Sequence, residues 1–371
     1  MSKIKITYIL SNIDKAIAFE WVADKLNHDR FELSFILLNN KEPFLFNWLK
    51  EKKIECYYIP HFGKKCYPIT FIKTLFFLLK IKPKIVHTHL LDANLIGLLA
   101  AKVLGIKKRI YTRHHSTFHH EYFPKAIKWD KYTNFLATDI VAISENVKQV
   151  LLHKENVNHT KIHLIHHGFD LEKFSNILPL EVEDLKQKYK LQNNAPIIGV
   201  ISRFINWKGI QFIVSAFKQI LKNYPNAKLV LANSTGPDKS EIDNILQQEL
   251  TPHQYKNIAF EPNLFALYQM FDVYVHVPIN KEIEAFGQTY VEALAAGIPS
   301  VFTLSGVASE FIEHYKNALV VDYENSNQIY NAIIELLTDK TFAKKLIENG
   351  KNSIKPFNLN LFIQKLENLY E

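Results

Sequence analysis

The feature that most constrains this chain is a regular alternation of short β-branched runs with longer helix-like segments. In the first half, near-continuous apolar runs are mostly followed by amphipathic sequence, as at 93–104 and 144–152. That rhythm is typical of a parallel sheet covered by helices on both faces. The runs lie at 4–10, 31–38, 54–58, 84–88, 109–112 and 140–142. They predict a Rossmann-like first domain.

The alternation restarts after a turn-rich linker, which predicts a second domain of the same kind. The linker contains the turn-rich stretch 166–170, a charged helix-like segment at 181–190 and Asn-Asn-Ala-Pro at 193–196. Further strand-like runs lie at 197–201, 228–232, 258–260, 273–276, 300–303 and 318–321. With 371 residues, the chain is also too long for one typical core of about 100 to 200 residues.

These patterns predict an α/β protein with two Rossmann-like domains facing across a cleft. We expect an N-terminal domain at 1–170, a C-terminal domain at 171–355, and a C-terminal helix at 356–371 that could return to the N-terminal domain. Open α/β sheets bind ligands at the carboxyl ends of their strands. The functional site is therefore expected in the cleft.

Cysteine usage and apolar patterning predict a cytoplasmic protein. Cys56 and Cys66 match neither a zinc spacing nor a disulfide framework, and the N-terminus lacks the pattern of a signal peptide. The longest apolar stretch, 70–81, is interrupted by two lysines and is shorter than the roughly 20 residues of a membrane span. The protein could sit peripherally on the inner face of the plasma membrane.

Positive charge is concentrated in the first half of the chain. Residues 1–175 contain 27 Lys and Arg against 16 Asp and Glu, whereas the remainder contains 18 against 21. A basic half indicates contact with something anionic, such as a membrane surface, a lipid phosphate or nucleic acid, although a Lys-rich solvated surface would give the same count. The acidic second half, and the absence of an aromatic-and-basic repeat, argue against nucleic acid.

The strongest local signal follows the strand-like run 273–276. A loop carrying Glu284 leads through Ala-Phe-Gly into a helix that contains Glu292. Backbone N–H groups at such a helix start could receive a phosphate or sugar oxygen, and a carboxylate can accept hydrogen bonds from sugar or ribose hydroxyls. The candidate N–H groups are those of Phe286, Gly287 and Gln288. Acids near a helix start are also favoured by the helix dipole alone.

A second signal lies in the loop after the first strand of the second domain. Arg203 and Lys208 precede Gly209, which opens the next helix. A basic pair in that position can hold a diphosphate and stabilise the charge that develops on a departing nucleotide. The alternative is a basic surface loop without a ligand.

Histidines are dense at the predicted strand ends of the first domain. They are His87, His89, His114, His115, His119 and His120. A metal cluster is one interpretation, but no Asp or Glu stands at matching spacing and no HExxH or Cys/His pattern occurs. We therefore predict no metal site, and we expect one or two of these side chains to line the cleft and bind a polar substrate.

An apolar helix-like stretch bracketed by lysines spans 64–84. It could lie on an anionic membrane surface. The favoured interpretation is a packed helix of the Rossmann layer with basic ends, because a βαβ unit requires a helix at this point.

Taken together, the motifs resemble glycosyltransferase family 4, the retaining glycosyl transferases group 1 with the two-domain GT-B fold. In the second domain the resemblance is carried by Ser202-Arg203 through Lys208-Gly209, by 272–275, by Glu284-Ala-Phe-Gly through 291–299, and by 316–320. In the first domain 86–89, 109–114 and 141–144 look like the family's strand ends, and 166–170 resembles its linker.

The resemblance implies a role for each matching residue. Arg203 and Lys208 would bind the donor diphosphate, Glu284 the hydroxyls of the transferred sugar, and Glu292 the ribose. His114 looks like the family's active-site histidine. The resemblance also implies that the configuration of the donor sugar is retained without a dedicated nucleophile. It implies no metal, and no cofactor beyond the nucleotide diphosphate sugar that serves as donor.

Two loops depart from the family's usual pattern. The first, 11–20, lacks the glycine pair often found after the first strand, so its residues do not support the family's placement of the acceptor at this loop. The second, 276–282, reads His-Val-Pro-Ile-Asn-Lys-Glu where many members have Pro-Ser. Glu282 therefore competes with Glu284, but the spacing to Glu292 and the following Phe-Gly favour Glu284.

The leading hypothesis is transfer of a sugar to a glycan or lipid-linked acceptor in cell-surface polysaccharide or lipopolysaccharide synthesis. An alternative enzyme is a sugar-nucleotide epimerase of GT-B fold, which would need no acceptor. The alternative that is not an enzyme is a non-catalytic glycan-binding protein.

Overall fold

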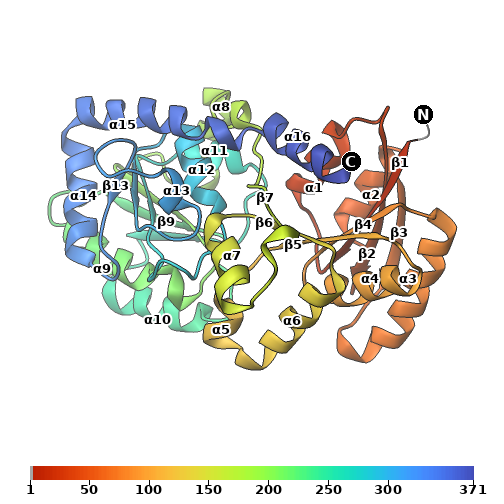
Figure 1. Ribbon diagram of the computed structural model, residues 1–371. Coiled ribbons are helices and arrows are strands. Elements are labelled where there is room, and N and C mark those ends of the chain that lie inside the picture. The colour runs from red at the N-terminus through yellow and green to blue at the C-terminus, as the bar shows by residue number, and fades with distance from the viewer. Residues whose placement is uncertain (1–2) are drawn as a thin grey trace. The chain divides into compact units, whose positions relative to one another are not determined.

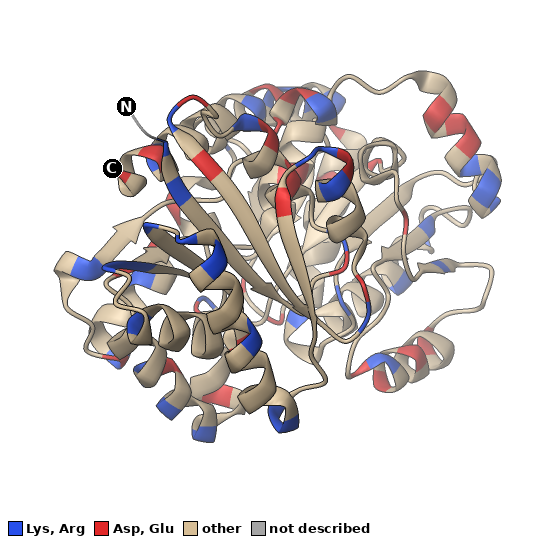
Figure 2. Cartoon of the chain, turned by 90° about the vertical axis from the view of Figure 1, so that its right-hand side faces the viewer, with Lys and Arg blue, Asp and Glu red and all other residues tan. Residues whose placement is uncertain are grey.

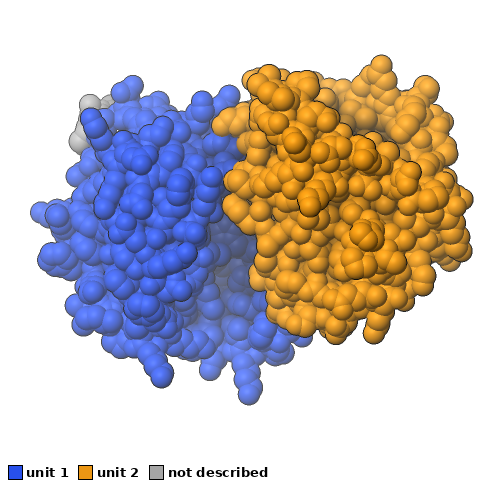
Figure 3. Space-filling model, turned by 180° about the vertical axis from the view of Figure 1, so that it is seen from behind, with its two compact units in different colours: residues 1–169, 359–371 blue, residues 170–358 orange. Residues whose placement is uncertain are grey.

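The computed structural model describes residues 3–371, so the first two residues of the predicted N-terminal domain lie outside it (Figure 1). The chain divides into two compact units. Unit 1 comprises residues 1–169 and 359–371, and unit 2 comprises residues 170–358 (Figure 3). Each unit contains one parallel sheet with its own helices and its own apolar core.

Unit 1 is built on a parallel sheet whose strand order is β3-β2-β1-β4-β5-β6-β7. The order reverses between β1 and β4, which is the switch point at which such sheets bind ligands. The strands are β1 (Ile4–Ser11), β2 (Phe31–Asn39), β3 (Glu55–Pro60), β4 (Ile85–His89), β5 (Lys108–Arg113), β6 (Asp139–Ala142) and β7 (Ile162–Leu164). β7 was not predicted from the sequence, because a three-residue strand at the edge of the sheet leaves almost no periodic signal.

Helices cover both faces of this sheet because alternate strand residues point to opposite sides. Tyr8 packs in a cluster with helices α1 (Ile17–Lys25), α2 (Phe44–Glu51) and α16 (Leu359–Tyr370). The next residue, Ile9, packs in a second cluster with α3 (Tyr67–Ile81) and α4 (Leu91–Val103). The remaining helices of unit 1 are α5 (Phe118–Tyr122), α6 (Ile127–Leu136) and α7 (Glu145–Gln149), the last continued by a π-helical turn at Val150–Lys154.

The C-terminal helix α16 belongs to unit 1, although it follows all of unit 2 in sequence. It lies beside α1, as Figure 1 shows in blue against red. Its Tyr370 hydroxyl bonds the Tyr8 hydroxyl and lies 2.8 Å from Nδ1 of His87. The two ends of the chain therefore share one core.

Unit 2 repeats the design with the strand order β10-β9-β8-β11-β12-β13 and a switch point between β8 and β11. Its strands are β8 (Ile197–Ile201), β9 (Lys228–Ala232), β10 (Tyr255–Ile258), β11 (Val273–His276), β12 (Ser300–Phe302) and β13 (Leu319–Val320). Its helices are α8 (Pro179–Tyr189), α9 (Ile210–Ile220), α10 (Lys239–Glu249), α11 (Leu264–Gln269), α12 (Gln288–Ala296), α13 (Ala308–Phe311), α14 (Ser326–Thr338) and α15 (Lys340–Ser353).

The predicted α/β class with two Rossmann-like domains is confirmed by these two sheets. The apolar strand runs were informative because the central strands are buried on both faces, as in β8, where all five residues are buried. β10 begins and ends earlier than the predicted run at 258–260.

Within residues 3–371, no helix has both the length and the apolar character needed to cross a membrane.

Candidate active site

Two loops meet at the switch point of unit 2. One follows β8 and carries Lys208; the other follows β11. Gly209 adopts φ 74°, and a Cβ placed on it would lie 2.0 Å from the Val277 carbonyl oxygen. The loops are further joined by a 3.0 Å hydrogen bond from the Ile279 N–H to the Trp207 carbonyl. Glycine is therefore required at 209 both by the left-handed backbone and by the close approach of the second loop.

Glu284, on the second loop, contacts Lys208 of the first loop and His276 at the end of β11. Its Oε1 is bonded by the Lys208 ammonium and lies 3.1 Å from Nε2 of His276, the last residue of β11. Its backbone N–H donates to Ser305 Oγ at 3.3 Å. Burial alone would raise the pKa of Glu284, but the Lys208 charge and the His276 hydrogen bond outweigh it and lower the pKa to about 2. Glu284 is therefore an ionised carboxylate held in place at neutral pH.

Gly287 forms the corner between this loop and α12. It has φ 83°, and an added Cβ would lie 2.5 Å from the Tyr290 ring. α12 starts at Gln288, whose side chain is exposed, whereas the Phe286 side chain is 3% exposed and its carbonyl accepts the Val307 N–H at 3.0 Å. The Phe286 side chain thus belongs to the packing under the loop, and the first amides of α12 follow directly after the corner.

Glu292 occupies the next part of α12 in a different electrostatic setting. It is 8% exposed, and its Oε2 accepts a 2.7 Å hydrogen bond from the Tyr268 hydroxyl of α11. Burial raises the pKa of Glu292 to about 7. The hydrogen bond from Tyr268 acts in the opposite direction but is the smaller of the two effects. This carboxyl group gains or loses a proton near neutral pH, unlike Glu284.

Arg203 is exposed at the end of β8 in the same loop as Lys208. Its carbonyl accepts the Ile205 N–H at 2.9 Å and the Ser202 hydroxyl at 3.0 Å, which fixes the turn. In unit 2 the predicted residues Lys208 and Glu284 are thus in direct contact. Arg203 lies on the same loop as Lys208, and Glu292 lies on the helix that follows the Glu284 loop.

His114 lies in unit 1, directly after β5, within a group of histidines at the carboxyl ends of the strands. Its Nε2 is 3.0 Å from Nδ1 of His89, and its ring stacks on His167 with centroids 5.7 Å apart. Burial lowers the pKa of His114 to about 4, so the ring is neutral at pH 7. Among the described residues Nε2 of His89 is buried without a hydrogen-bond partner, and a group in that state is a candidate for a ligand contact.

His167 and His276 were not singled out as site residues from the sequence. The sequence places His167 in the linker and His276 at the end of the strand-like run 273–276. Their positions in the sequence could have identified both residues as site candidates, because each stands where a predicted strand ends or a turn begins.

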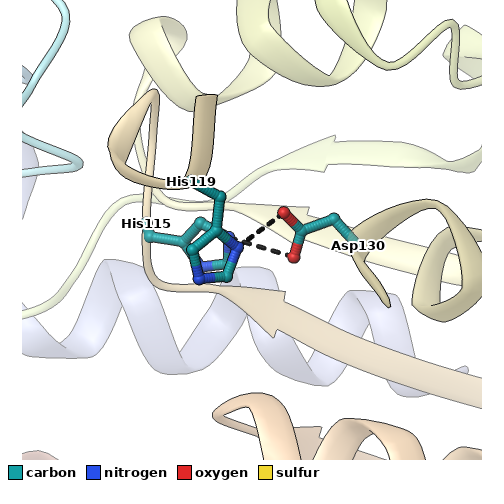
Figure 4. A group of neighbouring side chains, drawn as sticks. All are labelled: His115, His119 and Asp130. Carbon is teal, nitrogen blue, oxygen red and sulfur yellow. Dashed lines mark hydrogen bonds and ion pairs between the residues drawn. The ribbon is translucent and has the colours of Figure 1, made fainter. Parts of the chain in front are cut away.

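Two histidines and an aspartate next to His114 could hold a metal ion by geometry. His115, His119 and Asp130 bring ligand atoms within 4.8 Å of one another (Figure 4). His115 Nε2 lies 3.1 Å from Asp130 Oδ1, and His119 Nδ1 lies 2.7 Å from Oδ2. The fully buried Arg113 also reaches Oδ1, at 3.2 Å, and bonds Glu155. A guanidinium on the same carboxylate competes with a dication, and the contacts instead anchor the backbone on both sides of His114.

Two family models match the chain. One, described as Glycosyl transferases group 1, matches residues 181–353, and the other, described as Glycosyltransferase Family 4, matches residues 22–173. The first spans nearly all of unit 2, and the second spans most of unit 1.

Individual proteins are similar over most of the chain. Alpha-monoglucosyldiacylglycerol synthase of Acholeplasma laidlawii is 25% identical over 320 residues, covering 78% of this chain and 76% of the relative. CapM of Staphylococcus aureus, a capsular polysaccharide biosynthesis glycosyltransferase, is 28% identical over 312 residues, covering 81% and 79%. The structure of Anabaena HepE in complex with UDP-glucose has a TM-score of 0.84 at 18% identity and covers 99% of both chains, which is a similarity of fold.

Proposed function

The chain belongs to glycosyltransferase family 4 and has its two-domain GT-B fold, and from that premise we propose that it moves a sugar from a nucleotide diphosphate donor with retention of configuration. The acceptor in this proposal is a glycan or a lipid-linked glycan. As a family member the protein is a glycosyltransferase. The donor, the acceptor and the stereochemistry are the proposed part.

The observation that carries the proposal is the contact of Lys208 and His276 with Glu284 at the switch point of unit 2. A buried carboxylate held ionised by a lysine offers a fixed acceptor for sugar hydroxyls beside a fixed cation for a phosphate. Such preorganised charges cost no reorganisation when the leaving diphosphate develops its charge. The UDP-glucose bound by HepE, a protein of the same fold, supports a nucleotide sugar as donor.

In the proposed complex each residue has a separate task. Arg203 and Lys208 bind the diphosphate, the amides at the start of α12 contribute hydrogen bonds to its oxygens or to the sugar, and Glu292 accepts from the ribose hydroxyls. Glu284 accepts from hydroxyls of the transferred sugar. His114, the position that matches the family's active-site histidine, is neutral and hydrogen-bonds the sugar. The acceptor attacks on the face from which the phosphate leaves, and the leaving oxygen takes the acceptor's proton.

The setting proposed for this reaction is the synthesis of cell-surface polysaccharide or lipopolysaccharide on the cytoplasmic side of the membrane. The names of the two relatives, a glucosyldiacylglycerol synthase and a capsular glycosyltransferase, support a lipid-linked or glycan acceptor. The net positive charge of the first half supports peripheral contact with an anionic membrane.

Two neighbouring acids provide a matched test of the site. Glu284 is 6% exposed and paired with Lys208, whereas Glu282 is exposed two residues earlier. With a panel of nucleotide sugars and extracted lipid-linked acceptors, Glu284→Ala should lower kcat/KM by about 10² to 10³, as for removal of one preorganised polar contact. Glu282→Ala should leave it within about twofold.

The product should carry the anomeric configuration of the donor, as read by NMR. Equal losses in the two variants would place the sugar contact elsewhere. Epimer formation from the donor alone, without any acceptor, would instead indicate the epimerase. A protein that bound none of the nucleotides would contradict the donor assignment.

A further inference from the structure

Helix α3 turns an apolar stripe toward solvent. Four of its large side chains, at intervals of three and four residues, are exposed: Ile69 (52%), Ile72 (60%), Phe76 (62%) and Leu79 (58%). The opposite face is buried and includes two threonines, Thr70 and Thr74. Leu78 and Ile81 complete the buried face, so the helix is apolar on the side that faces the core and carries a second apolar stripe on the side that faces water.

The stripe is accompanied by positive charge alone. Six lysines and no acidic residue occur between His61 and Leu91, and they lie before α3, along it and directly after it. They are Lys64, Lys65, Lys73, Lys80, Lys82 and Lys84. Figure 2, turned toward this side of the chain, shows lysine and arginine in blue at several helix ends. Apolar side chains next to lysines complement a surface that is apolar inside and anionic outside.

A groove of about 640 Å³ adjoins the C-terminal end of α3. Leu79 belongs both to the stripe and to the lining of the groove, which continues over Leu104 and Ile106. The charged residues of its lining are the acidic Glu371 and four lysines, Lys82, Lys84, Lys107 and Lys108. The same pairing of apolar contact and positive charge therefore extends beyond the helix itself.

We propose that the α3 face, formed by Ile69, Ile72, Phe76 and Leu79 with the six lysines around it, docks onto an anionic lipid bilayer. The apolar side chains enter the headgroup and acyl boundary, and the lysines contact anionic headgroups. The helix lies in the plane of the interface, because its 15 residues span only about 22 Å and carry lysines along the stripe.

The start of α3 is tied to the carboxyl edge of the unit 1 sheet. The Tyr67 hydroxyl donates to Asp92 Oδ1 at 2.5 Å, and Nε2 of His61 lies 3.3 Å from Asp92 Oδ2. Asp92 stands in the first turn of α4, directly after β4. Because the groove at the other end of α3 is lined by Ile4, Ile85 and Lys108, the first residues of β1, β4 and β5, docking along α3 would hold both edges of the unit 1 sheet close to the bilayer. This last step rests on the proposed function, since it would bring a lipid-linked acceptor to the sheet edge that carries His89.

Vesicle binding tests the docking without requiring any sugar transfer. Co-sedimentation should show the wild-type protein binding vesicles that contain 30 mol% phosphatidylglycerol and not vesicles of phosphatidylcholine alone. Ile72→Gln/Phe76→Gln should weaken binding more than tenfold, given the apolar area withdrawn. Lys73→Gln/Lys80→Gln should weaken it roughly tenfold or more, at about 1 kcal/mol per lysine, and salt should weaken the wild type.

The matched control is Leu178→Gln/Leu180→Gln, which removes two leucines of unit 2 that are 65% and 69% exposed. It should bind vesicles like the wild type, and thermal melting should be unchanged in every variant.

Unchanged binding of the α3 variants, or equal binding of the wild type to both vesicle types, would overturn the proposal. So would a wild-type dimer that the apolar α3 variant converts to monomer, because the stripe would then be a protein interface. Transfer to a water-soluble acceptor should persist in the α3 variants, which separates a failure of docking from a failure of the enzyme.

Discussion

Glu284 and Glu292 show how two identical side chains on one short segment acquire different chemistry. Both are buried, which by itself raises the pKa of a carboxyl group. At Glu284 the adjacent Lys208 reverses the effect and lowers the pKa to about 2. At Glu292 the partner is the neutral Tyr268 hydroxyl, and the pKa stays raised at about 7. The first acid is a permanent anion, and the second responds to pH.

Affinity for the nucleotide sugar should therefore depend on the protonation of Glu292. Hydroxyls that donate to the carboxylate favour its ionised form, so binding lowers the pKa of Glu292 and releases a proton. Affinity should rise as pH increases through about 7 and level off above it. Titration calorimetry of the sugar nucleotide at a series of pH values measures this directly, since its diphosphate does not titrate in that range.

Glu292→Gln is the control for this titration. The amide cannot ionise, so the variant should bind more weakly and without the rise through neutral pH. An identical pH profile in both proteins would remove Glu292 from the donor site. The stability of the free wild-type protein should change with pH in the opposite direction to its affinity. Because the pKa of Glu292 is raised in the folded state, its contribution to the free energy of unfolding is fully present below about pH 4.5 and is lost as pH rises through about 7.

At the scale of elements, α16 closes unit 1 although unit 2 separates it from the rest of that unit in sequence. Leu359, Ile363, Leu366 and Leu369 join the cluster formed by β1, β2, α1 and α2. Its Tyr370 reaches Tyr8 and His87, and His87 in turn lies 2.8 Å from Thr112 on β5. The helix thus supports the strands that end in the histidine group.

Truncating a buried leucine of α16 should destabilise the protein. Leu366 is 2% exposed, so Leu366→Ala should lower the free energy of unfolding by about 2 to 5 kcal/mol through lost burial and a residual cavity. Leu361 on the same helix is 44% exposed, and Leu361→Ala should cost no more than about 0.5 kcal/mol. Urea unfolding of both variants makes the comparison, and equal costs would show that α16 does not pack as described.

At the scale of the whole molecule, the charges needed for the proposed reaction come from side chains and helix starts. Arg203 and Lys208 carry the positive charge at the switch point of unit 2, while the carboxylate of the His115, His119 and Asp130 group is already paired with Arg113. Fixed cations of this kind can do the work of a metal ion on a leaving diphosphate.

Sugar transfer should accordingly be insensitive to metal removal. Dialysis against EDTA should leave the rate of transfer within about twofold, whereas Lys208→Ala should lower kcat by about 10² to 10³ because it removes a charge from the leaving group. A loss of activity in EDTA that Mg²⁺ or Zn²⁺ restores would contradict the assignment and direct attention to His115, His119 and Asp130.

The sequence alone determined the fold class and the loops in which the candidate residues stand. Runs of apolar residues and helical periods depend on near neighbours in the chain, so β8, β11 and α12 could be recognised locally. The positions of Lys208, Glu284 and Glu292 relative to those elements followed from counting. The edge strand β7 could not be predicted, because it is too short to show a periodic pattern of apolar residues.

Only the tertiary structure decided which of these residues meet and in what state. Lys208 and Glu284 are 76 positions apart, and Tyr8 and Tyr370 are 362 apart, so their contacts depend on strand order and on the return of α16. The opposite pKa shifts of Glu284 and Glu292, and the exposed apolar face of α3, depend on what each side chain is packed against. Burial and pairing are collective properties of the folded chain, and no local pattern encodes them.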